Sequence, residues 1–341
     1  MYLAIDIRVA VTGFILQELV LRTTPSDFAM QFWTGVTDNQ WFANLASQSG
    51  VTEVNFWHPS GRAPFKTLPE GTPFLFKLKS PHHHIAGGGF FIKFVSLPLE
   101  LAWDAFGTKN GANTYEEFER LIRGAQGRNA DRAKDIGCSI LGEPFFLPRD
   151  GWVPLNEDFA GNIVSGKKFE SLDGAAGLRI WNSVEHAMHL SSPRVTAIAE
   201  RPVLRGAPTL YTPRRGQGTF RALVTSAYDR RCSITGETTL PVLEAAHIKP
   251  VAHDGLHNTY NGLLLRSDFH KLFDIGLVTV TPELRVLVSS RIKDLWFNGK
   301  AYSRLHGEKL AAIPSSHEDR PREDLLRWHN ENRFERGVHG A

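Results

Sequence analysis

The stretch that decides how this chain folds is LEAAHIKPVAHDGLHNTYNGLLLRSDFHKLFD, residues 243–274. It opens with an apolar run typical of a β-strand, which ends at His247. A polar loop then leads to Asn261, and the GLLLR that follows has the composition of a second strand. The next segment has helical spacing, which places His270 and Asp274 four residues apart on one helix face. The sequence therefore predicts a strand, a loop, a second strand and a helix.

This order and spacing resembles the HNH, or ββα-metal, nuclease finger. The resemblance covers about 60 residues, 228–291, and includes the flanking RCSITGE at 231–237. A finger of this family implies an endonuclease that uses a divalent cation. We expect Mg²⁺ here, with Mn²⁺ as the alternative.

The residue types also suit this chemistry on their own. Phosphodiester hydrolysis needs an activated water and a cation that neutralises the charge on the leaving and phosphoryl oxygens. A neutral imidazole accepts protons near neutral pH, so we assign the general base to His247. Asn261 is expected to pin the loop that orients His247 through hydrogen bonds from its amide. It is not assigned as the base, because an amide has no useful pKa. His270 and Asp274 are the expected metal ligands, with Ser267 as the helix N-cap. Waters and the scissile phosphate would complete the shell, which suits Mg²⁺.

Two positions depart from the pattern of the family. Many HNH fingers carry an Asp or His ligand directly before the general base, whereas this chain has Ala246. Others brace the finger with two Cys pairs around zinc, but here Thr235 stands where the partner of Cys232 would be. We therefore expect no structural zinc and a finger held by its own apolar packing. His253 and His257, in the connecting loop, are interpreted as histidines without a catalytic role.

Length and charge divide the chain. At 341 residues it exceeds what one hydrophobic core usually supports, so two domains are expected. Residues 201–341 carry 21 Lys and Arg against 15 Asp and Glu, whereas residues 1–200 carry 18 against 21. The basic excess therefore accompanies the predicted finger, as expected of a domain that approaches DNA phosphates.

The cysteine count and the apolar stretches bear on the compartment. Two cysteines, Cys138 and Cys232, argue against a disulfide scaffold and for a reducing environment. Charged residues interrupt the apolar opening of the chain at Asp6, Arg8 and Glu18. We therefore expect a cytoplasmic protein with no membrane segment.

Strand-like runs separated by turn signals follow from residue 51. They are VTEVNFW at 51–57, PFLFKLK at 73–79 and FFIKFV at 90–95. Helix-like PLELAWDAF and TYEEFERLIRG follow, at 98–106 and 114–124.

Over residues 20–170 this order resembles the PUA-like superfamily, which includes the EVE, ASCH and SRA domains. The resemblance implies a β-barrel that holds a flipped or modified base in an aromatic-lined pocket. Trp57 is the expected stacking platform, and Asn55 or Asn110 is expected to read a base edge.

A proline-rich segment marks the expected domain boundary. We predict a recognition domain at 1–190, a linker at 191–213 and an HNH domain with a C-terminal brace at 214–341. Arginines lead into the finger, and we expect them either to clamp the DNA backbone or to form a solvated face. They are Arg214, Arg215, Arg221, Arg230 and Arg231.

The sequence thus predicts an α+β fold: a PUA-like barrel followed by a ββα-metal finger. The chain resembles predicted bacterial restriction endonucleases, and we expect a metal-dependent enzyme that reads a modified cytosine in double-stranded DNA. One alternative is an HNH restriction endonuclease that recognises an unmodified sequence or a partner protein. Another is a non-catalytic DNA-binding relic. The sequence leaves the oligomeric state open, with a homodimer as one option.

Overall fold

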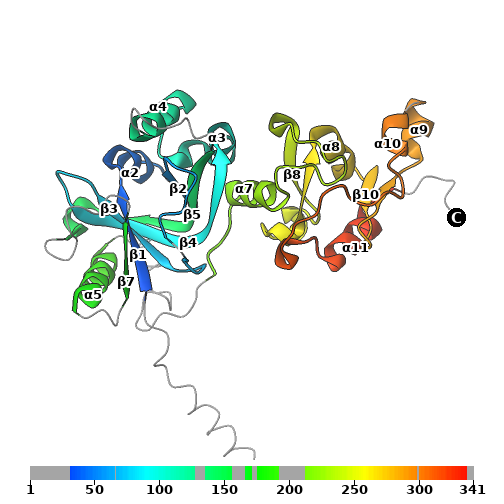
Figure 1. The fold of residues 1–341 in the computed structure, drawn as a ribbon. Coiled ribbons are helices and arrows are strands. Elements are labelled where there is room, and N and C mark those ends of the chain that lie inside the picture. The colour runs from blue at the N-terminus through cyan, green and yellow to red at the C-terminus, as the bar shows by residue number, and fades with distance from the viewer. Residues whose placement is uncertain are drawn as a thin grey trace, which may run out of the picture. The chain divides into compact units, whose positions relative to one another are not determined.

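The computed structural model describes residues 31–65, 67–126, 135–155, 166–170, 175–191, 212–297 and 299–335 (Figure 1). It divides into two compact units. The first comprises Met1–Val36, Leu75–Gly87 and Phe145–Tyr211, and the second comprises Thr37–Phe74, Gly88–Pro144 and Thr212–Ala341. Most of the predicted linker, 192–211, lies outside the described residues, so the predicted domain boundaries stay a prediction.

A seven-stranded sheet occupies the first half of the chain, in the order β2-β5-β4-β3-β1-β7, with β6 paired to β4. Its strands are β1 Gln31–Thr37, β2 Glu53–His58, β3 Pro73–Leu78, β4 His84–Pro98, β5 Asp135–Phe146, β6 Val153–Pro154 and β7 Gly166–Glu170. The expected strands at 51–57, 73–79 and 90–95 are confirmed. Among the described strands the path is open, ending at β2 and β7. The predicted closed PUA-like barrel is therefore not shown, and the fold is mixed α+β.

Four α-helices accompany the sheet in the described residues before 192. They are α2 Asn39–Ala46, α3 Leu99–Phe106, α4 Tyr115–Gln126 and α5 Ala175–Leu190. The helices predicted at 98–106 and 114–124 are thereby confirmed. Helix α2 begins where the Asp38 carboxylate accepts hydrogen bonds from the N–H groups of Gln40 and Trp41, as an N-cap residue does. No helix in the described part of the chain is long and apolar enough to span a bilayer.

The strand, loop, strand and helix predicted at 243–274 are confirmed as β8 Leu243–His247, β9 Gly262–Arg266 and α8 Ser267–Asp274. Helix α7, Gln217–Ala227, precedes them. The hairpin β10 Val278–Val280 and β11 Val286–Val288 follows, with helices α9 Arg291–Trp296, α10 Lys300–Ser303 and α11 Glu323–Asn332. The core of this part includes fully buried Phe220, Tyr228, Leu264 and Phe273. Apolar packing of this kind is what the sequence predicts for the finger.

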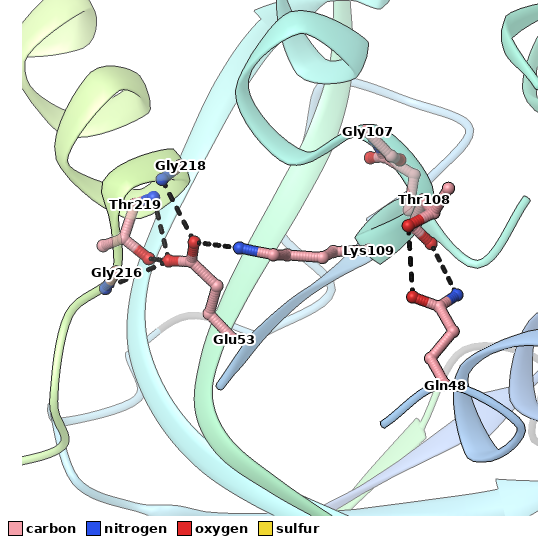
Figure 2. Close-up of polar contacts among 9 residues, drawn as sticks. Gln48, Glu53, Gly107, Thr108, Lys109, Gly216, Gly218 and Thr219 are labelled. Atoms are coloured by element: carbon pink, nitrogen blue, oxygen red, sulfur yellow. Dashed lines mark hydrogen bonds and ion pairs between the residues drawn. The ribbon is translucent and has the colours of Figure 1, made fainter. Parts of the chain in front are cut away.

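A buried carboxylate holds the start of helix α7 (Figure 2). The side chain of Glu53, 0% exposed, accepts hydrogen bonds from the backbone N–H groups of Gly216, Gly218 and Thr219 at 3.0–3.1 Å. The Thr219 hydroxyl also donates to it, and the Lys109 ammonium lies 2.8 Å away. Burial alone would raise the pKa of Glu53, but hydrogen bonds from Lys109 and Thr219 outweigh burial and lower it. The charged form thus satisfies helix N–H groups that would otherwise lack partners.

Candidate active site

The β8–β9 hairpin places the predicted general base. The two strands are antiparallel, and His247 at the end of β8 pairs with Gly262 at the start of β9. Beyond the ladder, the N–H of Ile248 donates to the carbonyl oxygen of Asn261 at 2.9 Å. The pairing therefore brings His247 and Asn261 to the same end of the hairpin, although they are 14 residues apart.

Asn261 closes the loop that follows His247. Its amide oxygen accepts the N–H of Lys249 at 2.9 Å, and its amide nitrogen donates to the carbonyl oxygens of Lys249 and Leu256, each at 2.9 Å. The residue is 1% exposed, so these bonds form away from competing water. This is the geometry that a loop-fixing residue needs.

Two aromatic rings frame the imidazole of His247. The ring of Phe220 lies parallel to it, with centroids 3.8 Å apart and an interplanar angle of 10°. On another side, His247 Nε2 lies 3.0 Å from Nδ1 of His257. Burial, followed by the charges of His257 and His270, lowers the pKa of His247 to about 4. The ring is therefore neutral at neutral pH and able to accept a proton.

His270 and Asp274 of helix α8, the two residues that the sequence assigns to a metal, lie next to each other. His270 Nε2 lies 3.4 Å from Asp274 Oδ2, and His270 Nδ1 lies 2.6 Å from Oε2 of Glu244 on β8. All three residues line one cavity of about 630 Å³, and the Asp274 side chain is 54% exposed. A carboxylate on the far nitrogen of a ligating histidine fixes its tautomer and its orientation.

These residues fit a cation that keeps much of its water. The described residues hold no group of three or more His, Cys, Asp or Glu arranged around one ion. His270 and Asp274 would supply two ligands, and Mg²⁺ is commonly held by one or two protein groups with waters and phosphate oxygens. Ala246, which stands where the HNH resemblance leads one to expect a further ligand, is fully buried in the core.

Two features near the finger correct or refine the sequence prediction. Ser267 is the first residue of α8 and not its N-cap, because Arg266 is extended and β9 runs directly into the helix. The Arg266 guanidinium instead forms two 2.7 Å hydrogen bonds with the Asp268 carboxylate. The Cys232 sulfur accepts the N–H groups of Thr235 and Arg266, at 3.4 and 3.3 Å, which ties this turn to β9.

Most of the arginines expected to contact the DNA backbone form ion pairs with carboxylates of the chain. Three are paired: Arg215 with Glu70, Arg221 with Asp104, and Arg230 with Asp135. Arg215 is held by both carboxylate oxygens at 2.9 Å, which fixes its orientation. Arg214 and Arg231 are exposed. Those two are therefore the better placed of the five to meet a phosphate.

The residues proposed for a base pocket lie in packed surroundings. Asn55 is 0% exposed, and its amide nitrogen donates to Oδ1 of Asn110 at 2.8 Å and to the sulfur of Cys138 at 3.3 Å. Trp57 donates from Nε1 to the Asn110 carbonyl at 3.1 Å and packs edge-on against Phe118. Asn55 has no accessible edge in this conformation, so it does not fit the base-reading role expected of it.

Three residues of the site were not assigned to it from the sequence. Glu244 is a strand residue whose reach to His270 depends on the β8–α8 contact. Phe220 belongs to an apolar helical stripe, which indicates only core packing. His257 sits in an aperiodic loop, so the sole signal in the sequence is that it is one of two histidines between His247 and Asn261.

Comparison with known proteins agrees with this geometry. Residues 232–281 match the family model described as HNH endonuclease. No curated protein sequence matches the chain. A solved structure named modification-dependent TagI restriction endonuclease is similar at 14% identity with a TM-score of 0.27, over 89% of this chain and 83% of that one. The family match makes the finger an HNH endonuclease domain and the protein a nuclease, a hydrolase of phosphodiester bonds.

Proposed function

We propose that this protein is a divalent-cation-dependent DNA endonuclease that acts as a restriction enzyme. The observation that carries the proposal is the HNH finger itself, in which one hairpin and one helix present a neutral His247 and the His270–Asp274 pair. The relic alternative is disfavoured because His247, Asn261 and His270 are all present, with Asn261 bonded to the loop after His247 and His270 beside Asp274.

In the proposed reaction His247 accepts a proton from the attacking water, which then bonds to phosphorus as the bond to the leaving oxygen breaks. Asn261 keeps the loop behind His247 in place through its three hydrogen bonds. His270 and Asp274 would hold the cation, which when bound neutralises charge on the phosphoryl and leaving oxygens. Substrate phosphate beside His247 favours the protonated ring and so raises its pKa from about 4 toward the working pH.

We further propose that the first part of the chain limits cleavage to DNA with a modified cytosine. The support is the resemblance of residues 20–170 to base-reading domains, together with a cavity of about 600 Å³ within the second unit. Phe65, Phe91 and Phe94 line this cavity, and Arg215 and Asn258 contribute polar groups. An extruded base needs stacking surfaces and edge hydrogen bonds of this kind. The cavity is therefore a better candidate than the packed surroundings of Asn55.

A cleavage panel tests both levels of the proposal. Matched plasmids with unmodified, methylated and hydroxymethylated cytosine are incubated with the protein in Mg²⁺, Mn²⁺ or EDTA. We expect cleavage with either cation and none in EDTA, and faster cleavage of one modified substrate. His247→Ala should lower the rate by at least about 10²-fold while DNA binding persists.

Two other outcomes would count against parts of the proposal. Undiminished cutting in EDTA would contradict cation dependence. Equal cutting of all substrates would contradict the modified-base reading and favour recognition of an unmodified sequence or of a partner protein.

A further inference from the structure

We propose that His257 is a positioning residue for the general base, and that it sets the tautomer in which His247 can accept a proton. The inference rests on the proposed function, because it takes His247 as the base. Its geometric support is the 3.0 Å contact between His247 Nε2 and His257 Nδ1.

The direction of this hydrogen bond decides whether His247 is active. A neutral imidazole carries one N–H and one free lone pair. If His257 donated, His247 would accept at Nε2 and carry its own proton on Nδ1, which leaves no lone pair for water. If His247 donates from Nε2, its Nδ1 lone pair is free. A base at this position therefore requires His257 to accept at Nδ1 and to carry its proton on Nε2.

The same bond serves the protonated state. When water transfers its proton to Nδ1, His247 becomes a cation and its Nε2–H still points at the Nδ1 lone pair of His257. A hydrogen bond to a charged donor is stronger than one between neutral groups, so the contact strengthens as the proton moves. Water loses one proton and His247 gains it, while the proton between the two rings stays on His247.

The surroundings keep the two rings in this relation. Phe220 is parallel to His247 at 3.8 Å and lies 5.9 Å from the His257 ring at an angle of 56°. Two other titratable groups bear on the pair: Glu53, which favours protonation of His257, and His270, which disfavours protonation of His247. Burial is the largest effect on His257 and lowers its pKa, which agrees with a neutral acceptor.

The site repeats this arrangement on its metal-binding side. There the far nitrogen of His270 is held by Glu244 at 2.6 Å, and its other nitrogen faces Asp274. His247 and His270 thus each have one ring nitrogen in contact with a side chain that can fix its tautomer: His257 for His247 and Glu244 for His270. His253 shares the loop with His257 but is exposed and packs on Trp328, so it provides a matched control.

Single-turnover cleavage by the full-length protein tests the proposal. His257→Leu removes the acceptor, whereas His257→Asn keeps an oxygen near the position of Nδ1. We expect His257→Leu to lower the cleavage rate by about 10- to 100-fold, a size typical of lost support around an active-site histidine, with unchanged DNA affinity. His257→Asn should recover most of the rate, and His253→Leu should match wild type.

The decisive measurement repeats His257→Leu in a His247→Ala background. A residue that acts through His247 has no further effect there, so the double variant should cleave at the rate of His247→Ala alone. An additional tenfold loss, or an Asn variant as slow as the Leu variant, would overturn the proposal. If His257→Leu fails to fold, His257→Asn is compared with His257→Gln, whose oxygen lies farther out. Asn should then be faster, and equal rates would overturn the positioning role.

Failure of the underlying function gives a different result. If His247→Ala cleaves like wild type, His247 is not the base and the proposed mechanism falls. If His247→Ala is inactive and His257→Leu is fully active, only the role of His257 falls.

Discussion

Phe220 of helix α7 lies flat against the imidazole of His247, with ring centroids 3.8 Å apart and planes within 10° of parallel. Helix α7 precedes the ββα finger in sequence, yet its Phe220 ring packs against one face of the proposed general base. Gly262, which pairs with His247 across the hairpin, is also tightly packed against α7. A Cβ there would lie 3.1 Å from the Phe220 ring and 2.5 Å from Val224. The orientation of His247 therefore depends on α7 as well as on β8.

Phe220→Leu should slow cleavage by about tenfold, because the smaller side chain lets the His247 ring rotate away from the attacking water. Single-turnover rates with saturating DNA measure this effect. Phe269→Leu is the matched control, since Phe269 is a buried aromatic of the same core and shows no ring contact with His247. Both variants should lose stability, and equal rate losses in the two would argue against orientation by Phe220.

Glu244→Gln should weaken the response to the cation. The amide oxygen can still accept from His270 Nδ1, but it lacks the charge that raises the basicity of the ring, and such partners are typically worth 10- to 100-fold in metal affinity. A titration of cleavage rate against Mg²⁺ should show a midpoint shifted upward with a similar plateau. Glu237→Gln is the control, because among the described residues the Glu237 carboxylate is hydrogen-bonded only within its own turn. This variant should leave the Mg²⁺ midpoint unchanged.

The part of the site that the sequence predicts well is local. The strand runs, the helical spacing of His270 and Asp274, and the Asn261 position follow from patterns within 32 residues, and the structure reproduces them. His257 could not be placed this way, because its contact depends on how the loop after His247 closes. Gly255 shows how tight that closure is, since a Cβ there would lie 1.8 Å from the Lys249 carbonyl oxygen.

What the sequence could not show depends on distant parts of the chain. The carboxylates that pair with Arg215, Arg221 and Arg230 are 95 to 145 residues away, so no spacing rule links them. Whether the sheet closes into a barrel depends on whether its two end strands, β2 and β7, pair with each other. The residue pattern within a strand does not determine this. Several helices and strands, including those of the finger, could thus be predicted, whereas closure of the sheet and the pairing of the arginines could not.

The exposed arginines, Arg214 and Arg231, should behave differently toward DNA from those paired with a carboxylate. Arg214→Ala and Arg231→Ala should each weaken binding and reduce the slope of log affinity against log salt by about 1, as expected for one lost phosphate contact. Arg221→Ala, which removes a cation already paired with Asp104, should change the slope much less. Fluorescence anisotropy in EDTA at several salt concentrations measures this. A slope that falls equally for all three would mean that the Arg221–Asp104 pair opens on DNA.

His58 should make folding stability depend on pH. It is buried, lies 2.9 Å from the Ser139 hydroxyl, and burial lowers its pKa to about 4. The unfolded chain binds a proton below about pH 6.5 while the folded ring stays neutral, so stability is lost as the pH falls from 6.5 toward 4. His58→Gln should reduce this loss by roughly 2 kcal/mol in urea unfolding at pH 4.5 and 7. His253→Gln, at an exposed position, should leave it unchanged.

Glu53→Gln should loosen helix α7 and with it the wall behind His247. The amide replaces one carboxylate oxygen with two N–H donors, which then face either the N–H of Gly218 or the N–H groups of Gly216 and Thr219, and it leaves the Lys109 ammonium without a counter-charge (Figure 2). We expect unfolding free energy to fall by about 2 to 4 kcal/mol, as for other buried charges that lose a partner.

The lowered pKa of Glu53 also predicts how the stability difference changes with pH, which a general loss of packing would not. Because the folded pKa is lowered, the contribution of the carboxylate is fully present above the ordinary value of 4.5 and is lost as the pH falls through the folded value. The difference between wild type and Glu53→Gln should therefore be large at pH 7 and shrink at low pH. Gln48→Ala, which removes a contact with Thr108 on the same face, is the control and should give a small difference at every pH. A Glu53→Gln deficit that stays constant down to pH 3 would mean that folding does not lower the pKa of the carboxylate, and the clamp on α7 would then need another explanation.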